Sequence, residues 1–548
     1  MDKTYLRVLL APNRYQSWSM VLGIHSSYVL VVFAEEILRK RDSLKTVAIG
    51  LTVGQSIAVC VLSNMILSRI LRIALAMFVS GMAGSKWHVP FAVINRTCWG
   101  IRGAWFVVMN RIILSCCWFG IEGWYGGQMV RIMIGAIWPS FHHMKNRLPA
   151  SVATTSNELL SFMIFWLIGL PLILLRPERY DRPALFASAI VTVAMFIIFI
   201  WAVVKQGNAG PLWNSPDQAS NVQLSGSQVN WIMLWMITRG IGWWASGILY
   251  QSDFTRYAKQ NNNQFIGQIL VFPLVSSCTN IFGIITTSCA RGFYPEEPLL
   301  WKLYDLLYAI QMHEGKWARV AVFFGAFAFL LSTLSATVML DRFLSLSTSS
   351  DKCNQIAATA IVGGIDFSAL LPRYINIRRG AYIIACTGVL IQPWRILNTA
   401  NSFIAALTGY AVFLSPLTGI MLAEYHIVRQ RRIKLSHIFT PNATSDYWFW
   451  RGLNPRAPVA FILGVLPSLP GFASSINPQG VSVSTDWMRI YYMSWFLGVS
   501  ISGFVWIFLN KAWPPRGLGE TDQTETPGSS SDHDTAESFS QPEEKAIP

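Results

Sequence analysis

Two side chains in one apolar stretch, Trp118 and Glu122, have the spacing of a ligand site. On a helix, residues four positions apart lie on the same face, one turn from each other. A flat indole beside a hydrogen-bonding carboxylate suits a planar heterocycle, which needs both stacking and polar recognition. An ionisable group in an apolar segment is costly, which makes it a candidate for function. The residues leave a second interpretation equally open, in which Trp118 packs in the core and Glu122 faces an internal water or Arg111.

A second candidate region is the glycine-rich run Gly240-Ile-Gly-Trp-Trp-Ala-Ser246. Glycines weaken a helix, and broken helices line ligand sites in the middle of some membrane proteins. Trp243 or Trp244 would then supply a second aromatic wall. Close helix packing through small residues is the alternative. Asp253 follows at the end of this segment, where an ion pair or a gate is favoured over contact with a ligand.

A third candidate pair is Gln355 and Thr359, again four residues apart and able to face a common cavity. A hydrogen bond between two helices explains the same pair equally well. The eight cysteines show no zinc or disulfide spacing, so we expect no metal site and no cofactor. The neighbouring His142 and His143 lack an acid, nucleophile or metal-ligand set at helical spacing, so we do not expect an enzyme.

The segments that hold these residues have the composition of membrane-spanning segments. Hydrophobic residues make up 53% of the 548 positions and charged residues only 13%, against roughly 25% charged in soluble domains. Apolar runs of about 20 residues span a hydrocarbon core about 30 Å thick, and repeated spans of this kind must be helices. We therefore predict an all-α membrane protein with about twelve transmembrane helices, at residues 16–34, 47–82, 104–135, 157–175, 183–204, 230–250, 265–289, 319–339 continuing through 354–370, 380–397, 402–427, 457–474 and 488–510.

Basic residues set the expected orientation. The net charge of +15 comes largely from loops that follow even-numbered spans, and positive loops stay in the cytoplasm. Both termini are then cytoplasmic, and nucleic acid is not an expected partner. The predicted organisation is a cytoplasmic segment at 1–15, a transmembrane domain at 16–510 and a tail at 511–548. The tail is rich in Ser, Thr, Glu, Asp and Pro from Gly517 onward and should be disordered.

An ordered series of motifs resembles the nucleobase–cation symport family, the permeases for purines and cytosine, uracil, allantoin and thiamine, and especially its fungal members. The motifs lie at Lys86–Phe91, Trp118–Gly127, Ser252–Lys259, Asp366–Gly380, Gly409–Tyr425, Leu453–Ala457 and Leu469–Phe472. The resemblance implies a core of two inverted five-helix repeats plus two C-terminal helices. It also implies import of a nucleobase or related heterocycle by alternating access, most simply across the plasma membrane.

The resemblance implies a binding site at Trp118, Glu122, Trp244 and Thr359. Where the family has Gln and Asn, this chain has Glu122 and Thr359. Ionised Glu offers only acceptors, whereas Gln offers a donor and an acceptor. Glu122 therefore suits a cationic or donor-rich ligand such as thiamine, nicotinamide riboside or cytosine, over uracil or allantoin, or it carries a coupling proton. The positions of the sodium-binding hydroxyls read Cys353 and Asn354, which favours protons over sodium as the coupling ion.

Two departures from the family keep another interpretation open. The first span lacks the usual motif, and the polar run Asp341–Lys352 divides the eighth span. A transport-defective relative that acts as a membrane sensor or binding protein, or an imperfectly assembled gene sequence, would show the same features. The sequence leaves the exact substrate and the oligomeric state undetermined.

Overall fold

The computed structural model describes residues 73–173, 181–213, 226–249, 251–256, 272–300, 302–337, 359–398, 409–477 and 479–521. The predicted segment 1–15, the predicted first span at 16–34, Gln355 and the insert at 341–352 lie outside these residues. Within them the secondary structure is helical, and the β-type pairing consists of one isolated bridge between Trp450 and Leu453.

The longer helices, in chain order, are α6 (Ile73–Trp87), α7 (Phe91–Trp99), α8 (Ala104–Ile137), α9 (Ser156–Leu172), α10 (Asp181–Gln206), α11 (Gly226–Leu249), α13 (Phe272–Phe293), α14 (Leu303–His313), α15 (Lys316–Thr337), α16 (Thr359–Leu370), α17 (Ile377–Leu390), α20 (Ala411–Ala423), α22 (Arg456–Val465), α23 (Leu469–Ile476), α24 (Thr485–Tyr492) and α25 (Ser494–Ala512). Shorter helices are α12 (Gln251–Thr255), α18 (Pro393–Asn398) and α21 (Leu435–Ile438).

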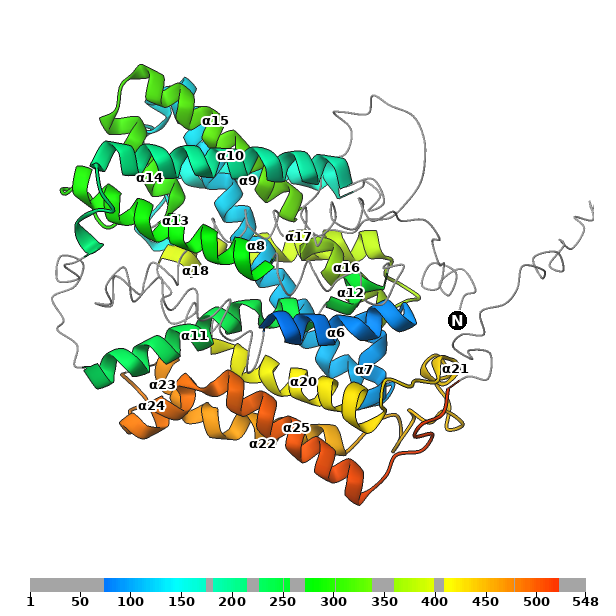
Figure 1. Cartoon of the computed structure of the whole chain (residues 1–548). Helices are drawn as coiled ribbons and strands as arrows, with labels where there is room; N and C mark the ends of the chain where they lie inside the picture. Colours follow the sequence, from blue (N-terminus) through cyan, green and yellow to red (C-terminus); the bar gives the residue numbers. More distant parts are fainter. Residues whose placement is uncertain are drawn as a thin grey trace, which may run out of the picture.

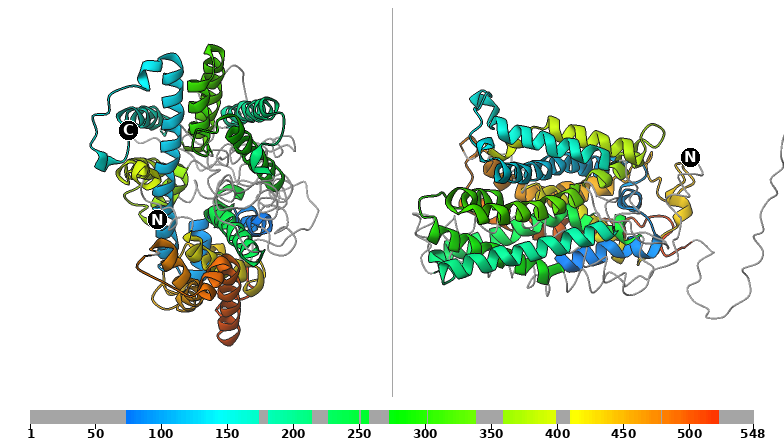
Figure 2. Two further views of the ribbon diagram at one scale, coloured as in Figure 1. Left: turned by 90° about the vertical axis from the view of Figure 1, so that its left-hand side faces the viewer. Right: turned by 90° about the horizontal axis from the view of Figure 1, so that it is seen from above.

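Most long helices run in roughly one direction through the molecule (Figures 1 and 2). Helices α7 and α21 lie at one end of this bundle, and α14, α18 and α24 lie at the other (Figure 1). Among the described residues, six stretches are long and apolar enough to cross a bilayer: Ala104–Ile137, Ala189–Gln206, Lys316–Leu334, Ala411–Val428, Arg456–Ile476 and Ser494–Ala512. The predicted all-helical fold is confirmed, while the number of twelve spans stays a prediction.

Helix α8 forms the centre of the bundle. In its most apolar 18-residue window 72% of the residues are buried, against 17% for the window in α10. The difference places α8 inside the protein and α10 at its periphery. With 34 residues, α8 is about 51 Å long at a rise of 1.5 Å per residue, which exceeds a hydrocarbon core of about 30 Å.

Among the helices around α8, which also include α15, two groups pack closely. Helices α6, α11 and α12 make one unit, in which the Ser80 hydroxyl donates to the Ile248 carbonyl at 2.7 Å and the Thr255 hydroxyl donates to the Gly81 carbonyl at 2.6 Å. Helices α8, α9, α16 and α17 make the other unit. Both units contain small residues at their contacts, which lets helix backbones approach closely in the absence of water.

Several predicted spans contain more than one helical element among the described residues. The predicted eighth span contains two helices, α15 and α16, on either side of residues 338–358, which lie outside the described part. The predicted span at 402–427 ends in a π-helical turn, Glu424–Val428. Buried Glu424 accepts bonds there from Arg429 Nε at 2.6 Å and Trp506 Nε1 at 3.0 Å, which fixes α20 against α25. The predicted span at 457–474 is broken into α22 and α23 near Pro467 and Pro470, because proline removes a backbone donor.

Candidate functional site

Glycines on α8 fix the helix that carries the first candidate pair. A Cβ at Gly120 would lie 2.5 Å from the Gly388 carbonyl oxygen of α17, and a Cβ at Gly127 would lie 2.6 Å from the Phe162 Cα of α9. Both distances are too short for real contacts, so only glycine permits these helix crossings. The backbone of α8 on either side of residue 122 is therefore held directly against its neighbours.

The Trp118 and Glu122 side chains are both buried, with 9% and 5% of their surface exposed. Trp118 belongs to the main core together with Ile121 and Tyr125, in a part of α8, residues 114–130, that is buried on every side. Arg111 is eleven residues from Glu122 on the same helix, a rise of about 16 Å. The interpretation in which Arg111 neutralises Glu122 is therefore wrong, because neither side chain is long enough to cover that distance.

For Trp243, Trp244 and Thr359, the structure describes the position of the backbone only. Trp243 and Trp244 lie on α11, and Thr359 is the first residue of α16. Their side chains fall outside the described part of the structure, as does all of Gln355. Helix α16 packs against α8, and α11 packs against α6. The aromatic sandwich of Trp118 and Trp244 thus stays a prediction from the sequence.

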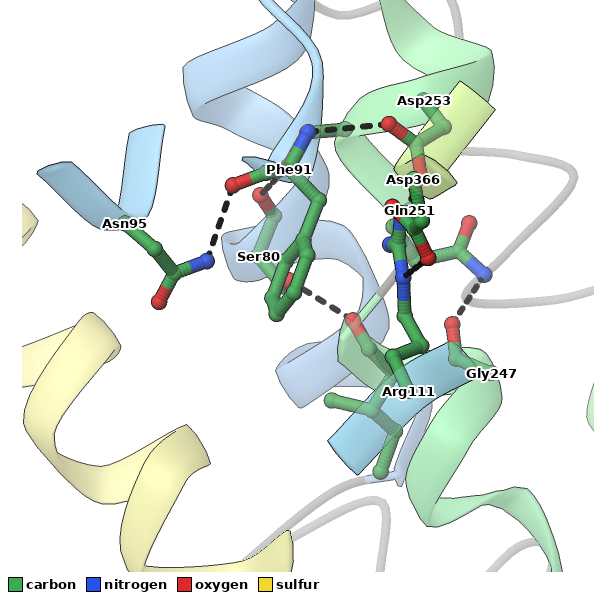
Figure 3. A network of polar contacts seen from close by, with 10 residues as sticks. Ser80, Phe91, Asn95, Arg111, Gly247, Gln251, Asp253 and Asp366 are labelled. Atoms are coloured by element: carbon green, nitrogen blue, oxygen red, sulfur yellow. Dashed lines mark hydrogen bonds and ion pairs between the residues drawn. The ribbon is translucent and has the colours of Figure 1, made fainter. Parts of the chain in front are cut away.

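A buried ionic cluster joins three helices at the start of α8 (Figure 3). Arg111 Nη1 donates to Asp253 Oδ2 of α12 at 2.7 Å. The same guanidinium donates through Nε and Nη2 to the two carboxylate oxygens of Asp366 on α16. The side chains of Arg111, Asp253 and Asp366 are 3%, 1% and 0% exposed.

The charges of this cluster are further compensated by α7. Two carboxylates and one guanidinium leave an excess negative charge, and the Phe91 backbone N–H, at the first residue of α7, donates to Asp253 Oδ1 at 2.9 Å. A helix N-terminus favours a negative charge. The Arg111 guanidinium also lies 4.3 Å from the centre of the Phe91 ring. Desolvating an ion pair is costly unless its remaining hydrogen bonds are made, and here α7 supplies them.

The cluster connects the two packed units. Arg111 and Asp366 belong to the unit of α8 and α16, and Asp253 belongs to the unit of α6, α11 and α12. Asp253 thus forms an ion pair with Arg111, while a gate at this position stays a prediction. Sequence reasoning did not assign Asp366 to this cluster, although an acid inside an apolar segment is a signal for it.

The opposite end of α8 is held by α14. His142 Nε2 donates to Gln311 Oε1 at 3.0 Å, and Gln311 Nε2 donates to the Ile132 carbonyl at 2.8 Å. Burial lowers the pKa of His142, although its bond to Gln311 acts in the other direction. Its Nδ1 is buried without a hydrogen-bond partner among the described residues. Burial also raises the pKa of Asp305 on α14, opposed by Lys302.

In the described part of the chain no three His, Cys, Asp or Glu side chains come together as metal ligands. The geometry is that of a polytopic helical membrane protein in which two helix units meet at the central helix α8. Trp118 and Glu122 lie near the middle of α8, and polar contacts lie near its ends. This is the architecture of a secondary transporter.

Comparisons with known proteins identify the family. Residues 43–498 match the family described as permeases for cytosine/purines, uracil, thiamine and allantoin, and the chain belongs to it. The chain is 30% identical to the transporter aclS of Aspergillus oryzae over 516 residues, covering 88% of this chain and 82% of that protein. It is 29% identical to the allantoin permease of Saccharomyces cerevisiae, covering 80% and 66%. The protein is therefore an integral, multi-pass secondary transporter and not an enzyme.

The fold comparison agrees with this assignment. The inward-facing structure of Mhp1 superimposes with a TM-score of 0.64 at 17% sequence identity, covering 92% of each chain. At this identity the likeness concerns the fold. The resemblance in the motif series is thereby confirmed at the level of family and architecture.

Proposed function

We propose that the protein imports a nucleobase or related heterocycle across the plasma membrane by proton symport. The proposed architecture has twelve spans, two inverted five-helix repeats followed by two C-terminal helices, and both termini in the cytoplasm. Two observations support this orientation: α7 and α21 lie at one end of the bundle (Figure 1), and positive charge gathers there, at Arg96 in the last turn of α7 and at Arg102, Arg432 and Lys434 in the adjoining loops. Positive loops face the cytoplasm.

The proposed substrate site comprises Trp118, Glu122, Trp244 and Thr359, with Trp243 and Gln355 near it. The single observation that carries this proposal is the burial of Trp118 and Glu122 on a helix whose backbone is fixed by glycine contacts. A fixed backbone keeps the spacing between the Trp118 indole and the Glu122 carboxylate constant. A planar substrate stacks on the Trp118 indole while its N–H groups donate to Glu122.

The ionic cluster at Arg111 serves as the proposed gate on the cytoplasmic side. Its bond to Asp253 crosses between the two helix units, so rocking one unit against the other must break or rearrange it. While the bond is made, the ends of α8, α12 and α16 stay together and the cytoplasmic path is closed. Alternating access through relative motion of such units is the general scheme for transporters of this architecture.

Glu122 also provides a route for coupling. A carboxylate next to the substrate can take up a proton on one side of the membrane and release it on the other. Proton coupling is proposed in preference to sodium because Cys353 and Asn354 stand where sodium-coupled relatives have hydroxyl ligands.

The test is uptake in yeast cells that lack their own permeases. Radiolabelled uracil, cytosine, allantoin, thiamine and nicotinamide riboside are supplied separately and then in competition, at several external pH values. Saturable uptake of at least one compound that increases at acidic pH is expected. Saturable binding without accumulation in reconstituted vesicles would instead support a membrane sensor or binding protein.

The variant Glu122→Gln separates the two roles of the carboxylate. A role in recognition predicts a changed order of substrate preference with the pH dependence retained. A role in coupling predicts uptake that no longer depends on pH. The matched control is Glu158→Gln, because Glu158 pairs with Arg131 at the opposite end of α8 from the Arg111 cluster. Its substrate order and pH profile should remain those of the parent protein.

A further inference from the structure

A strained turn at residues 448–453 presents an arginine and a tryptophan on the surface. Phe449 and Arg451 have φ angles of +48° and +51°, a conformation that side chains other than glycine rarely adopt. The turn is held by the Gly452 N–H, which donates to the Trp448 carbonyl at 2.9 Å, and by the Leu453 N–H, which donates to the Trp450 carbonyl at 2.9 Å. Trp450 lies between the two strained residues and is 65% exposed. Strain of this kind persists where a special geometry is needed.

The turn is joined to the start of α8 and forms a basic cluster with it. The backbone N–H groups of Arg102 and Gly103 donate to the Gly452 carbonyl at 2.9 and 3.2 Å. The Arg102 guanidinium lies 5.2 Å from the centre of the Trp448 ring, and that of Arg451 lies 5.7 Å from the Trp450 ring. Two exposed guanidinium groups are thus each set beside an indole, on one turn and the helix start bonded to it.

Further positive charge lies along the same edge. Arg456, at the first residue of α22, donates through Nη1 to Asn510 Oδ1 at 3.3 Å, and exposed Lys511 follows Asn510 on α25. The neighbouring acid Asp446 is already paired with Lys434 and His437. Among the described residues no ion pair neutralises Arg102, Arg451 or Lys511. The edge therefore carries an uncompensated positive field.

An apolar seam begins directly beside this cluster. Phe106 of α8 packs edge-to-face against Phe461 of α22 at 5.3 Å between ring centres, and both rings contact Trp99. Exposed apolar side chains continue away from the turn, at Met109 and Ile113 on α8, at Ile462 on α22 and at Leu466 directly after α22. Cationic groups at the end of an exposed apolar seam fit a molecule with an anionic head and hydrocarbon chains.

We propose that the edge formed by Arg102, Trp448, Trp450 and Arg451 binds the headgroup of an anionic membrane phospholipid, with its acyl chains along the seam between Phe106 and Phe461. The planar guanidinium group of arginine can donate two parallel hydrogen bonds to phosphate oxygens. Indoles are favoured at the boundary between lipid and water. In the proposed orientation this edge faces the cytoplasmic leaflet, which is where anionic lipids attract basic groups.

The test uses the purified full-length protein, delipidated in mild detergent and then mixed with phosphatidylinositol or with phosphatidylcholine. Bound lipids are counted by native mass spectrometry, and thermal unfolding is followed in parallel. The double variant Arg102→Gln/Arg451→Gln is compared with Arg373→Gln/Arg378→Gln. The control removes the same charge from two exposed arginines, Arg373 before α17 and Arg378 in its first turn.

The parent protein and the control should retain phosphatidylinositol in preference to phosphatidylcholine and should gain thermal stability from it. The Arg102/Arg451 variant should bind phosphatidylinositol about tenfold or more weakly, since each arginine near the anionic surface contributes to the attraction. Arg102→Lys/Arg451→Lys should recover part of the affinity. Equal phosphatidylinositol retention by both glutamine variants overturns the proposal. Stabilisation of the parent by soluble inositol phosphate alone also overturns it, because the site would then recognise a free phosphate without chains.

Discussion

Arg111 Nη1 on α8 donates a 2.7 Å hydrogen bond to Asp253 Oδ2 on α12, in a region where both side chains are almost completely buried. The two residues are 142 positions apart in the sequence. Their bond connects the two helix units directly, whereas α7 bridges them by packing against α8, α12 and α16. Asp366 holds the same guanidinium from the side of α16. The strength of this connection should set how readily the proposed cytoplasmic gate opens.

Replacing Asp253 with Asn should weaken this connection while keeping the shape of the side chain. Removing one partner of a buried ion pair costs about 3–5 kcal/mol, and here Asp366 retains part of the neutralisation of Arg111. We expect uptake to fall at least about tenfold at normal abundance in the membrane. Cysteines introduced at the ends of α12 and α16 should become more reactive from the cytoplasmic side.

The control for this experiment is Asp486→Asn. Asp486 is 79% exposed and pairs with Arg489, and exposed pairs contribute little. Its uptake and cysteine reactivity should match the parent protein. Unchanged uptake and reactivity in Asp253→Asn would exclude a gating role for the Arg111–Asp253 bond.

Substituting Gly120 with Ala should destabilise the protein. The new methyl would lie 2.5 Å from the Gly388 carbonyl oxygen, so α8 and α17 must separate, at a cost of about 1–3 kcal/mol. Gly325→Ala on α15 is the matched control, because a Cβ there meets nothing within 4 Å. It should stabilise the protein by roughly 0.5–1 kcal/mol, since alanine loses less backbone entropy in a helix. Thermal unfolding of both variants in detergent gives the comparison, and a stable Gly120→Ala protein would contradict the close crossing.

The stability of the contact between α8 and α14 should depend on pH through His142. Burial lowers the pKa of His142 below its ordinary value of 6.5 in the folded protein, so the unfolded chain takes up this proton first as the pH falls. The contribution of His142 is fully present above pH 6.5 and is lost progressively below it, down to the folded-state pKa.

Thermal unfolding between about pH 5 and pH 7.5, a range that brackets the ordinary histidine pKa of about 6.5, measures this effect. The melting temperature should fall toward the acidic end for the parent protein, and His142→Gln should show a flatter profile. His143→Gln, at the exposed neighbouring side chain, should keep the slope of the parent. An unchanged slope in His142→Gln would show that other groups govern the acid sensitivity.

Trp118 and Trp124 should respond differently to substitution by Leu. Trp118→Leu removes the proposed stacking surface, and aromatic pairs contribute about 0.5–1.5 kcal/mol beyond area burial, so KM should rise roughly two- to tenfold. Trp124 packs against Phe162 and Trp394, so Trp124→Leu should lower thermal stability and leave KM for the transported compound unchanged. Uptake kinetics at matched surface abundance distinguish the two. Equal KM values for Trp118→Leu and the parent protein would show that Trp118 does not contact the substrate.

The sequence predicts helices well where apolar runs are long, and predicts contacts poorly where they join distant segments. The run at 104–135 corresponds to α8 at 104–137, and the spacing of Trp118 and Glu122 follows directly from helix geometry. The partner of Arg111 does not follow from spacing, because Asp366 lies 255 residues away. The π-helical turn at Glu424–Val428 carries no periodicity signal, since tertiary bonds from Arg429 and Trp506 to Glu424 stabilise it.

The uninterrupted length of α8 separates three tasks along one rod. Arg111 lies near its beginning, Trp118 and Glu122 near its middle, and Ile132, which α14 contacts, near its end. Because one continuous helix fixes the spacing of these residues, substitutions at Trp118 and Glu122, unlike those at the glycine crossings, should leave the registration of both ends untouched. With the substrate site at Trp118 and Glu122 as proposed, a permease of this kind can change its cargo through a few central side chains while the Arg111 cluster keeps its contacts.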